Sequence, residues 1–208
     1  MKIKKRTKKA IAKALTLALF IGGTLLGVSL LAYEKPMQQF AISNLLISEE
    51  VQNYRSVVEK YAAEYEVSGY VDVILAMMMQ ESGGRGNDPM QSSESYCGDR
   101  NCIDDPELSI KQGVYYFSRT LDKAEGDLEL AVQSYNFGSG FIDYVHNETG
   151  EYTQDVAINF SREMYEKDPE KEKYRCPRKE AKQIDACYGD IYYVRSVMEY
   201  RDVLGANK

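Results

Sequence analysis

The chain has 208 residues and a formal net charge of −6, from 26 Lys and Arg against 32 Asp and Glu. Seven of the basic residues and none of the acidic ones precede Tyr33, so the remainder carries 19 basic against 32 acidic residues, a net charge of −13. Such an acidic chain argues against nucleic acid or an anionic membrane surface as its partner, because phosphate binding needs clustered Lys and Arg; an uncharged polymer such as a glycan stays open.

The N-terminal residues predict a membrane-directing segment. Residues 1–13 are rich in Lys and Arg, and 14–33 form an uncharged run of twenty residues. About 20 apolar residues span a bilayer, and basic residues before such a run favour a cytoplasmic N-terminus. We therefore expect 1–13 to be cytoplasmic, 14–33 to be a transmembrane anchor, and 34–47 to be a linker to an extracellular domain. A cleaved signal peptide and secretion is the alternative, although residues 29–34 lack a small-x-small cleavage site.

Helical periodicity begins at Ser48, a candidate N-cap followed by two acidic residues in the first turn. One apolar face then predicts a long first helix, with Val51, Tyr54, Val57, Val58, Tyr61 and Tyr65. A second helix over 70–82 places Ile74, Met77, Met78 and Glu81 on one stripe. Gly83 and Gly84 end it.

Capping residues and apolar spacing predict further helices along the rest of the chain. Asp105 and Pro106 begin one helix, and Asp127 caps another that ends near Gly138. Two more helices are expected around Val156 to Met164 and over 191–200. Brief strand pairing at 151–153 or in the loop around Asn87 is the only competing pattern. The sequence therefore predicts a mainly α-helical domain over residues 48–202.

The four cysteines all lie in the part expected to be extracellular, where disulfides persist. Three pairings are possible, and we favour near neighbours because each such pair flanks a short segment. This pairing joins Cys97 to Cys102 and Cys176 to Cys187. A four-cysteine zinc site is the alternative, but the spacings lack paired C-x-x-C motifs.

Glu81 is the candidate catalytic acid. It follows the apolar stripe of its helix, so its carboxyl should face the packed side, and burial without a cation raises a carboxyl pKa. The negative end of the helix dipole also disfavours the anion. A carboxyl that stays protonated near neutral pH can donate a proton to a leaving glycosidic oxygen. Taken alone, however, a Glu before two glycines is more often a solvated residue.

Residues after Gly84 supply polar groups beside this acid. Asp88 is the nearest second carboxylate, and it could stabilise an oxocarbenium ion, act as nucleophile or orient water. Before a proline it could equally be a turn residue. Hydrogen-bonding groups suited to sugar hydroxyls follow the glycines, namely Asn87, Gln91, Ser92 and Ser93.

Two stretches together make the pattern specific. Residues 80–94 read Gln-Glu-Ser-Gly-Gly through Asp-Pro-Met-Gln-Ser-Ser-Glu, and residues 131–138 read Ala-Val-Gln-Ser-Tyr-Asn-Phe-Gly. They resemble the lysozyme-like superfamily of lytic transglycosylases and goose-type lysozymes. The detailed form is similar to the muramidase domain of cell-wall hydrolases from Gram-positive conjugative elements, as is the ending from Tyr188 to Tyr200.

The resemblance implies roles for particular residues. Glu81 would be the general acid and Asp88 the assisting carboxylate, with the glycan cleft lined by Gln91, Ser92, Tyr135 and Asn136. We add Ser93, for its hydroxyl, and Tyr193 as candidates for substrate contact. The Cys97 to Cys102 loop and the charged insertion around 163–186 depart from those hydrolases, and we expect no second, cysteine-peptidase domain of the kind they carry.

The expected activity is therefore an N-acetylmuramidase that cleaves peptidoglycan strands, opening the wall locally for conjugative transfer with conjugation or type IV secretion components as partners. A lytic transglycosylase with Glu81 as sole acid and base is one alternative, and a non-catalytic glycan-binding scaffold is another. His146 is the only histidine, which excludes a multi-histidine zinc site. A Cys-His peptidase would need a free cysteine beside His146, whereas we expect the cysteines to form disulfides. No metal or other cofactor is expected.

Overall fold

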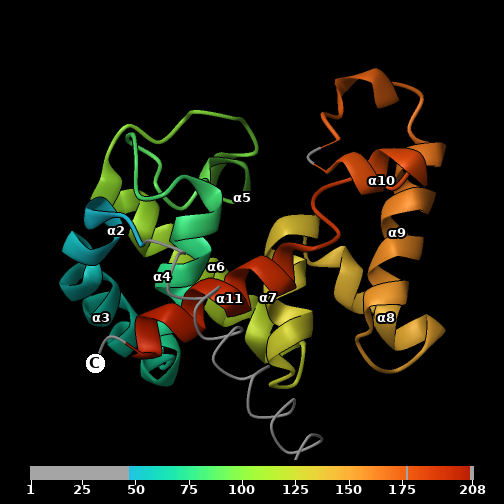
Figure 1. Ribbon diagram of the computed structural model, residues 1–208. Helices are drawn as coiled ribbons and strands as arrows, with labels where there is room; N and C mark the ends of the chain where they lie inside the picture. Colours follow the sequence, from blue (N-terminus) through green and yellow to red (C-terminus); the bar gives the residue numbers. More distant parts are fainter. Residues whose placement is uncertain (1–46, 177, 207–208) are drawn as a thin grey trace, which may run out of the picture. The chain divides into compact units, whose positions relative to one another are not determined.

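Each helix that the sequence predicts from Ser48 onward forms in the computed structural model, which describes residues 47–176 and 178–206 (Figure 1). These residues contain no β-strand, so the expectation of a mainly α-helical domain is confirmed for them. Residues 151–153 and the loop around Asn87 are bends and coil, and the suggested strand pairing there is wrong. The expected segments at 1–13 and 14–33, and all but the end of the linker at 34–47, lie outside the described residues.

The first predicted helix is divided in two. The Ser48 hydroxyl accepts a hydrogen bond from the Val51 amide at 3.2 Å and begins α2 (Glu49–Asn53), while α3 (Arg55–Glu64) follows after a break at Tyr54. Ser48 also donates to the Gly83 carbonyl at 2.8 Å. This bond fastens the start of the domain to the turn that follows the second predicted helix.

That second helix, α4 (Val71–Glu81), is the buried centre of the fold, and a short 3₁₀ turn, η1 (Ser68–Tyr70), precedes it. Its residues from Ile74 to Met78 have no solvent exposure. Helix α11 (Tyr193–Ala206) packs along it, with α2 and α3 also in contact. Residues Gly83 and Gly84 adopt positive φ angles of 66° and 75° and turn the chain sharply after α4.

Two capped helices cover α3 and α11. Asp105 accepts from the Glu107 amide to begin α6 (Pro106–Lys123), and Asp127 accepts from the Leu130 amide to begin α7 (Leu128–Phe137). Helix α6 packs between α3 and α7, and α7 contacts α11 and α8.

Helices α8 (Gly140–Glu148) and α9 (Gln154–Lys167) lie beyond α7 (Figure 1). They meet α7 in an aromatic cluster built on Phe137, Phe141 and Phe160, whose ring centroids are 4.9 to 5.4 Å apart. Helix α8 was not predicted, because its apolar positions follow a Gly-Ser-Gly segment that suggests a loop.

Short elements and one boundary also differ from the sequence prediction. The helices α5 (Ser93–Cys97) and α10 (Lys179–Gln183) and the 3₁₀ turn η2 (Lys171–Lys173) are each too short to leave a clear apolar period. Helix α11 begins two residues later and runs six residues further than the predicted 191–200. The disulfides join Cys97 to Cys102 and Cys176 to Cys187, the near-neighbour pairing.

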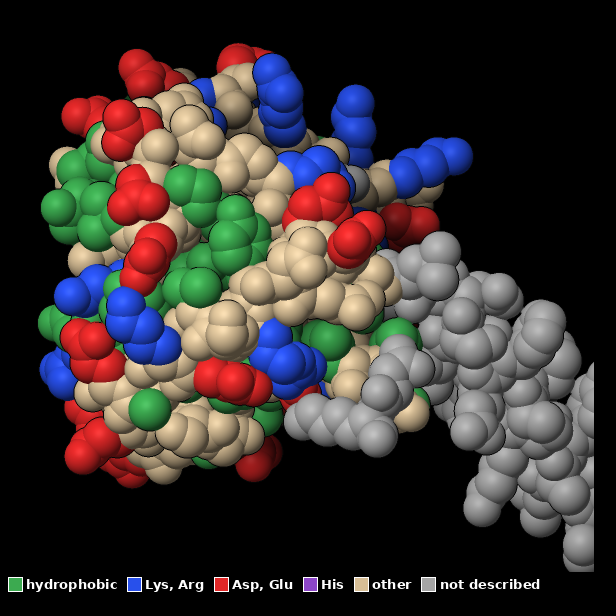
Figure 2. All heavy atoms as spheres, turned by 90° about the vertical axis from the view of Figure 1, so that its left-hand side faces the viewer, with side chains coloured by type: hydrophobic (Ala, Val, Ile, Leu, Met, Phe, Trp, Pro, Cys, Tyr) green, Lys and Arg blue, Asp and Glu red, His purple; other side chains and the backbone are tan. Residues whose placement is uncertain are grey.

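Figure 2 shows acidic and basic side chains interspersed with apolar ones across the face that includes α2 and α3. Ion pairs bridge helices here, including Lys60 with Glu107 at 2.7 Å between α3 and α6. Exposed pairs of this kind contribute little to stability, so the buried helices hold the fold. Within the described residues, none of the helices has the length and apolar character that crossing a membrane requires.

We expect Gly113→Ala to lower the free energy of unfolding by about 1 to 3 kcal/mol, because a methyl group at this position overpacks the core. A Cβ atom on Gly113 in α6 would lie 2.6 Å from Met90 Cβ and 2.8 Å from the Tyr135 hydroxyl. Denaturant unfolding followed by circular dichroism measures the change. Gly205→Ala is the matched control, since nothing lies within 4 Å of its Cβ position. Equal stability of the two variants would contradict the expectation.

Candidate active site

A cleft of about 270 Å³ opens at the C-terminal end of α4. The loop after α4, the residues around the first disulfide and the end of α7 surround it. Its lining is mostly polar and consists of Glu81, Asp88, Gln91, Ser93, Glu94, Arg100, Asn101, Tyr135 and Asn136. The cleft therefore brings together, around Glu81, residues from three separate parts of the sequence.

Glu81 is the last residue of α4 and reaches the cleft partly buried. Its Oε1 accepts a hydrogen bond from the Tyr193 hydroxyl at 2.7 Å. Burial raises the pKa of Glu81 to about 7; the Tyr193 hydrogen bond opposes this rise, and the negative charges of Asp88 and Asp190 add to it. A carboxyl with this pKa is protonated in a large fraction of molecules at neutral pH and can donate a proton.

Tyr193 begins α11 and lies 112 positions beyond Glu81 in sequence, yet its side chain is only 1% exposed. Burial, and then the nearby Glu81 charge, hold the pKa of the Tyr193 hydroxyl well above its usual value. This hydroxyl remains a donor at any physiological pH. The packing of α11 on α4 thus fixes the orientation of the Glu81 carboxyl.

Asp88 has the opposite environment, because its carboxylate accepts hydrogen bonds on both oxygens. Oδ1 accepts from the Ser109 hydroxyl at 2.6 Å and the Ser92 amide at 2.9 Å. Oδ2 accepts from the Ser93 hydroxyl at 2.7 Å and the Ser93 amide at 3.1 Å. Partial burial raises the pKa of Asp88, but these hydrogen bonds outweigh it and hold the pKa below its ordinary value. Asp88 is therefore a fixed anion.

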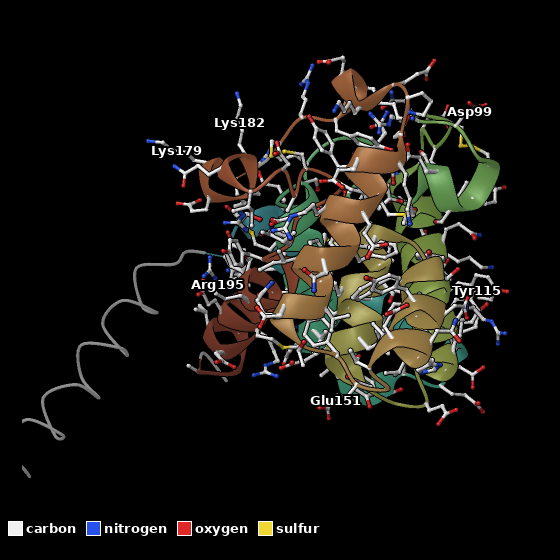
Figure 3. The ribbon with its side chains drawn as sticks, turned by 90° about the vertical axis from the view of Figure 1, so that its right-hand side faces the viewer. Asp99, Tyr115, Glu151, Lys179, Lys182 and Arg195 are labelled. Carbon is white, nitrogen blue, oxygen red and sulfur yellow. A yellow bond between two sulfur atoms is a disulfide. The ribbon has the colours of Figure 1, made fainter. Side chains whose placement is uncertain are left out.

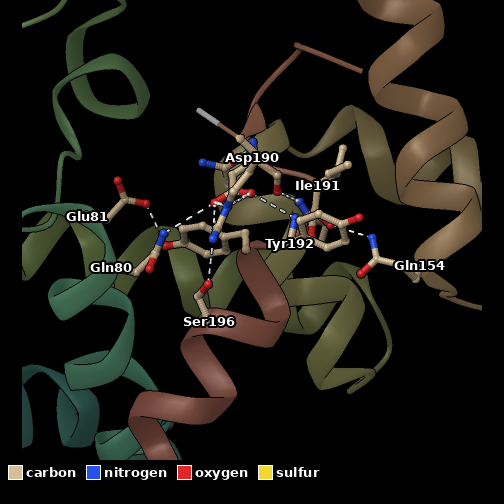
Figure 4. A network of polar contacts seen from close by, with 11 residues as sticks. Gln80, Glu81, Gln154, Asp190, Ile191, Tyr192 and Ser196 are labelled. Carbon is tan, nitrogen blue, oxygen red and sulfur yellow. Dashed lines mark hydrogen bonds and ion pairs between the residues drawn. The ribbon is translucent and has the colours of Figure 1, made fainter. Parts of the chain in front are cut away.

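A second network of polar contacts lies near the end of α4 and is centred on Asp190 (Figure 4). The Asp190 side chain belongs to a residue that is only 7% exposed. The Arg178 guanidinium donates to both Asp190 carboxylate oxygens, at 2.8 to 3.1 Å, and to the Ser196 hydroxyl at 2.7 Å. Gln80, the neighbour of Glu81, reaches Asp190 Oδ2 at 3.5 Å. This network ties the charged insertion to the end of α4.

The backbone of Asp190 is fixed from α7. Its amide donates to Asn136 Oδ1 at 2.7 Å, and its carbonyl accepts from the buried Gln133 side chain at 2.9 Å. Asn136 also lines the cleft. The Tyr-Asn pair of the second sequence motif therefore has a structural role, because Asn136 holds the Asp190 segment and Tyr135 donates to the Met90 carbonyl at 2.9 Å.

The sequence-predicted residues do not all face the cleft. Gln91, Ser93, Tyr135 and Asn136 line it with Glu81 and Asp88. Ser92 is buried, and its hydroxyl donates to the Ser109 carbonyl at 3.0 Å. Tyr193 lies behind Glu81 and is not among the lining residues.

Sequence reasoning missed several residues of the cleft and its support, namely Glu94, Arg100, Asn101, Ser109, Arg178 and Asp190. The sequence suggested a special position for two of them, since Glu94 ends the first motif stretch and Asp190 lies in the Tyr-Gly-Asp ending that carried part of the resemblance. Among the residues that the structure describes, no three His, Cys, Asp or Glu side chains form a group that could hold a metal ion.

Comparison with known proteins gives a family and several relatives. The family model described as lysozyme-like matches residues 48–201. The chain is 44% identical to the bifunctional muramidase/DL-endopeptidase CwlT of Bacillus subtilis (strain 168) over 162 residues, which cover 78% of this chain and 44% of that protein. It thus spans less than half of that relative. It is 35% identical to a B. subtilis protein named uncharacterized membrane protein YocA, covering 96% of this chain and 90% of that one.

A solved structure also matches. The crystal structure of a Staphylococcus aureus (subsp. aureus Mu50) protein, described as similar to a lipoprotein of the NLP/P60 family, is 40% identical to this chain. The match has a TM-score of 0.64 and covers 75% of this chain and 54% of that one. Over the matched part, the described domain is therefore similar to that protein in both fold and sequence.

We expect Tyr193→Phe to raise the pKa of Glu81 above about 7, because the lost hydrogen bond favours the carboxylate. An NMR titration of the Glu81 carboxyl carbon measures the shift. Tyr144→Phe is the matched control, since that hydroxyl donates to Glu163 at 2.8 Å between α8 and α9, away from the cleft. A Glu81 pKa that falls or stays constant in Tyr193→Phe would contradict this account.

We expect Asp88→Asn to lower the free energy of unfolding at pH 7 by about 2 to 3 kcal/mol, since an amide cannot accept every hydrogen bond made here. The folded-state pKa of Asp88 is depressed, so its contribution is present above the ordinary value of 3.8 and is lost as pH falls below it. The difference from wild type should therefore shrink in acid. Denaturant unfolding at several pH values measures it, with the exposed Asp104→Asn as control; a constant difference would argue against the linkage.

Proposed function

The chain belongs to the lysozyme-like family, and from this premise we propose that it cleaves the glycan strands of peptidoglycan with Glu81 as general acid. The observation that carries the proposal is the Glu81 carboxyl, which opens on a polar cleft, has a pKa of about 7 and is oriented by Tyr193. Family membership alone does not define chemistry, which depends on the residues of this site.

The proposed step is cleavage of the β-1,4 bond between N-acetylmuramic acid and N-acetylglucosamine. Protonated Glu81 donates its proton to the glycosidic oxygen as the bond breaks, and positive charge develops on the sugar ring. The polar lining of the cleft offers amide and hydroxyl groups that suit sugar hydroxyls, among them Gln91, Ser93 and Asn136.

Asp88 is best suited to electrostatic stabilisation of that positive charge. The serine donors around it keep it ionised, and it lines the same cleft as Glu81. A nucleophile needs a free lone pair directed at the sugar, but both Asp88 oxygens already accept hydrogen bonds from Ser92, Ser93 and Ser109. We therefore propose that Asp88 acts as a fixed negative charge and does not form a covalent intermediate.

The same observation favours a second candidate, a lytic transglycosylase. With Asp88 committed to its serine donors, Glu81 would serve first as acid and then as base. The base step would deprotonate a hydroxyl of the muramic acid itself, and the product would be an anhydro sugar. The two candidates differ only in whether water or the substrate's own hydroxyl attacks.

The cysteines do not support a cysteine-peptidase activity. All four form disulfides, so the chain offers no free thiol as a nucleophile. The endopeptidase named for CwlT is a property of that longer relative. The muramidase part of the name supports the proposal, since the present chain matches 44% of that protein and falls within the lysozyme-like family.

We also propose that residues 14–33 anchor the enzyme in the cytoplasmic membrane, with the described domain on the outer side. The twenty uncharged residues and the membrane-protein name of YocA support this location. From the sequence resemblance we propose that the enzyme opens the wall locally during conjugative transfer, so deletion of the gene should reduce transfer.

We expect the full-length chain, purified in detergent, to release soluble fragments from purified peptidoglycan, and Glu81→Gln to release none while keeping its helical circular dichroism. Mass spectrometry of the products identifies the reaction. Reducing muramic ends would establish a muramidase, and anhydro-muramic ends would establish a transglycosylase. Glu151→Gln, exposed and labelled in Figure 3, is the matched control and should remain active. If wild type gives no glycan product, the protein is instead a binding or scaffold component.

A further inference from the structure

One wall of the cleft is a loop closed by a disulfide, which we call the Cys97–Cys102 loop and define as residues 94–102. Three of its residues, Glu94, Arg100 and Asn101, line the cleft beside Glu81 and Asp88. This loop departs from the hydrolases that the sequence resembles, and its residues after Glu94 match no motif that would indicate a function. Its position makes it the part of the cleft best placed to set substrate preference.

The loop has a defined shape because the two residues that flank it, Ser93 and Ile103, are joined to each other, and Ser93 is also bonded to Asp88. The Ser93 hydroxyl donates to Asp88 Oδ2 at 2.7 Å and accepts from the Ile103 amide at 3.2 Å. The disulfide closes the segment between these ends. Gly98 and Asn101 adopt positive φ angles of 82° and 61°, which turn the backbone within the loop.

Arg100 is the only cation among the described residues that line the cleft, whereas Glu81, Asp88 and Glu94 are all acidic. The Arg100 side chain is 79% exposed, and its Nε donates to Glu94 Oε1 at 2.7 Å. No other described residue accepts a hydrogen bond from it, so four of its five N–H groups are available. Figure 3 shows Lys179 and Lys182 of α10 well apart from Asp99 of this loop.

The contact with Glu94 does not prevent Arg100 from binding another partner. Glu94 is 61% exposed, and an exposed ion pair contributes little to stability, so a stronger partner can replace Glu94. A planar guanidinium with free N–H groups matches the two oxygens of a carboxylate. An uncharged sugar would not require a cation at this position.

We propose that Arg100 is a specificity-determining residue that binds a carboxylate carried by the muramyl residue of the substrate. The inference rests on the proposed function and names its substrate class, an anionic muramyl glycan in preference to a neutral one. The carboxylate has two sources of the same chemistry, the lactyl group of a peptide-free strand or the stem peptide of a substituted one. Without Arg100, the acidic side chains of the cleft would repel either.

The test compares three substrates with the full-length wild type and Arg100→Gln. The substrates are peptide-bearing strands, strands stripped of peptide so that the lactyl carboxylate is free, and stripped strands whose lactyl group is a neutral methylamide. We expect Arg100→Gln to raise KM about tenfold, with kcat nearly unchanged, on the strands whose carboxylate Arg100 binds. KM on the methylamide strands should not change.

The substrate on which KM rises identifies the source of the carboxylate. Arg100→Lys should recover part of the affinity, because it keeps the charge but not the planar pair of donors. Arg119→Gln is the matched control, since Arg119 is an exposed arginine paired with Asp122 on α6, outside the cleft. It should leave KM unchanged on all three substrates.

Two outcomes would overturn the inference while leaving the proposed function intact. One is an equal rise in KM on charged and neutral strands, which would indicate a general loss of cleft shape. The other is no change on any substrate. If wild type itself cleaves none of the three, the proposed function fails and this inference fails with it.

Discussion

The burial of one acid at the end of the buried helix α4 is the constraint on which the site depends. Helix α4 has no exposed residue from Ile74 to Met78, and the chain that leaves it must turn at once toward the cleft. Glu81 lies at that point, where burial disfavours its anion and Tyr193 is the group that holds it. The Glu81 carboxyl therefore has this orientation only when α11 is packed against α4.

Glu81 and Asp88 show how two carboxyl groups in one cleft acquire different properties from their surroundings. Glu81 has a single hydrogen-bond donor and a raised pKa, whereas Asp88 has serine amides and hydroxyls on both oxygens and a lowered pKa. At neutral pH one can therefore carry a proton while the other stays charged. The hydrogen bond from Ser109 also joins the loop after α4 to α6.

The insertion around 163–186 contributes through Arg178. Its guanidinium pairs with Asp190, which is nearly buried, and a buried carboxylate without a partner would be costly. The disulfide between Cys176 and Cys187 closes the segment from which Arg178 extends. The two disulfide-closed segments thus have different roles, since one supplies the arginine that pairs with Asp190 and the other forms the wall of the cleft that carries Arg100.

The sequence by itself determined most of the longer helices, their caps at Ser48, Asp105 and Asp127, and the position of Glu81 at the end of α4, because apolar period, capping and helix ends are local properties. The near-neighbour cysteine pairing was also predictable from short spacing. Only the tertiary structure decided what surrounds Glu81, since Tyr193 lies 112 residues away and Asp190 109 residues away. It also decided that Ser92 is buried while Arg100 faces the cleft. Such contacts depend on how helices pack, and no local pattern encodes them.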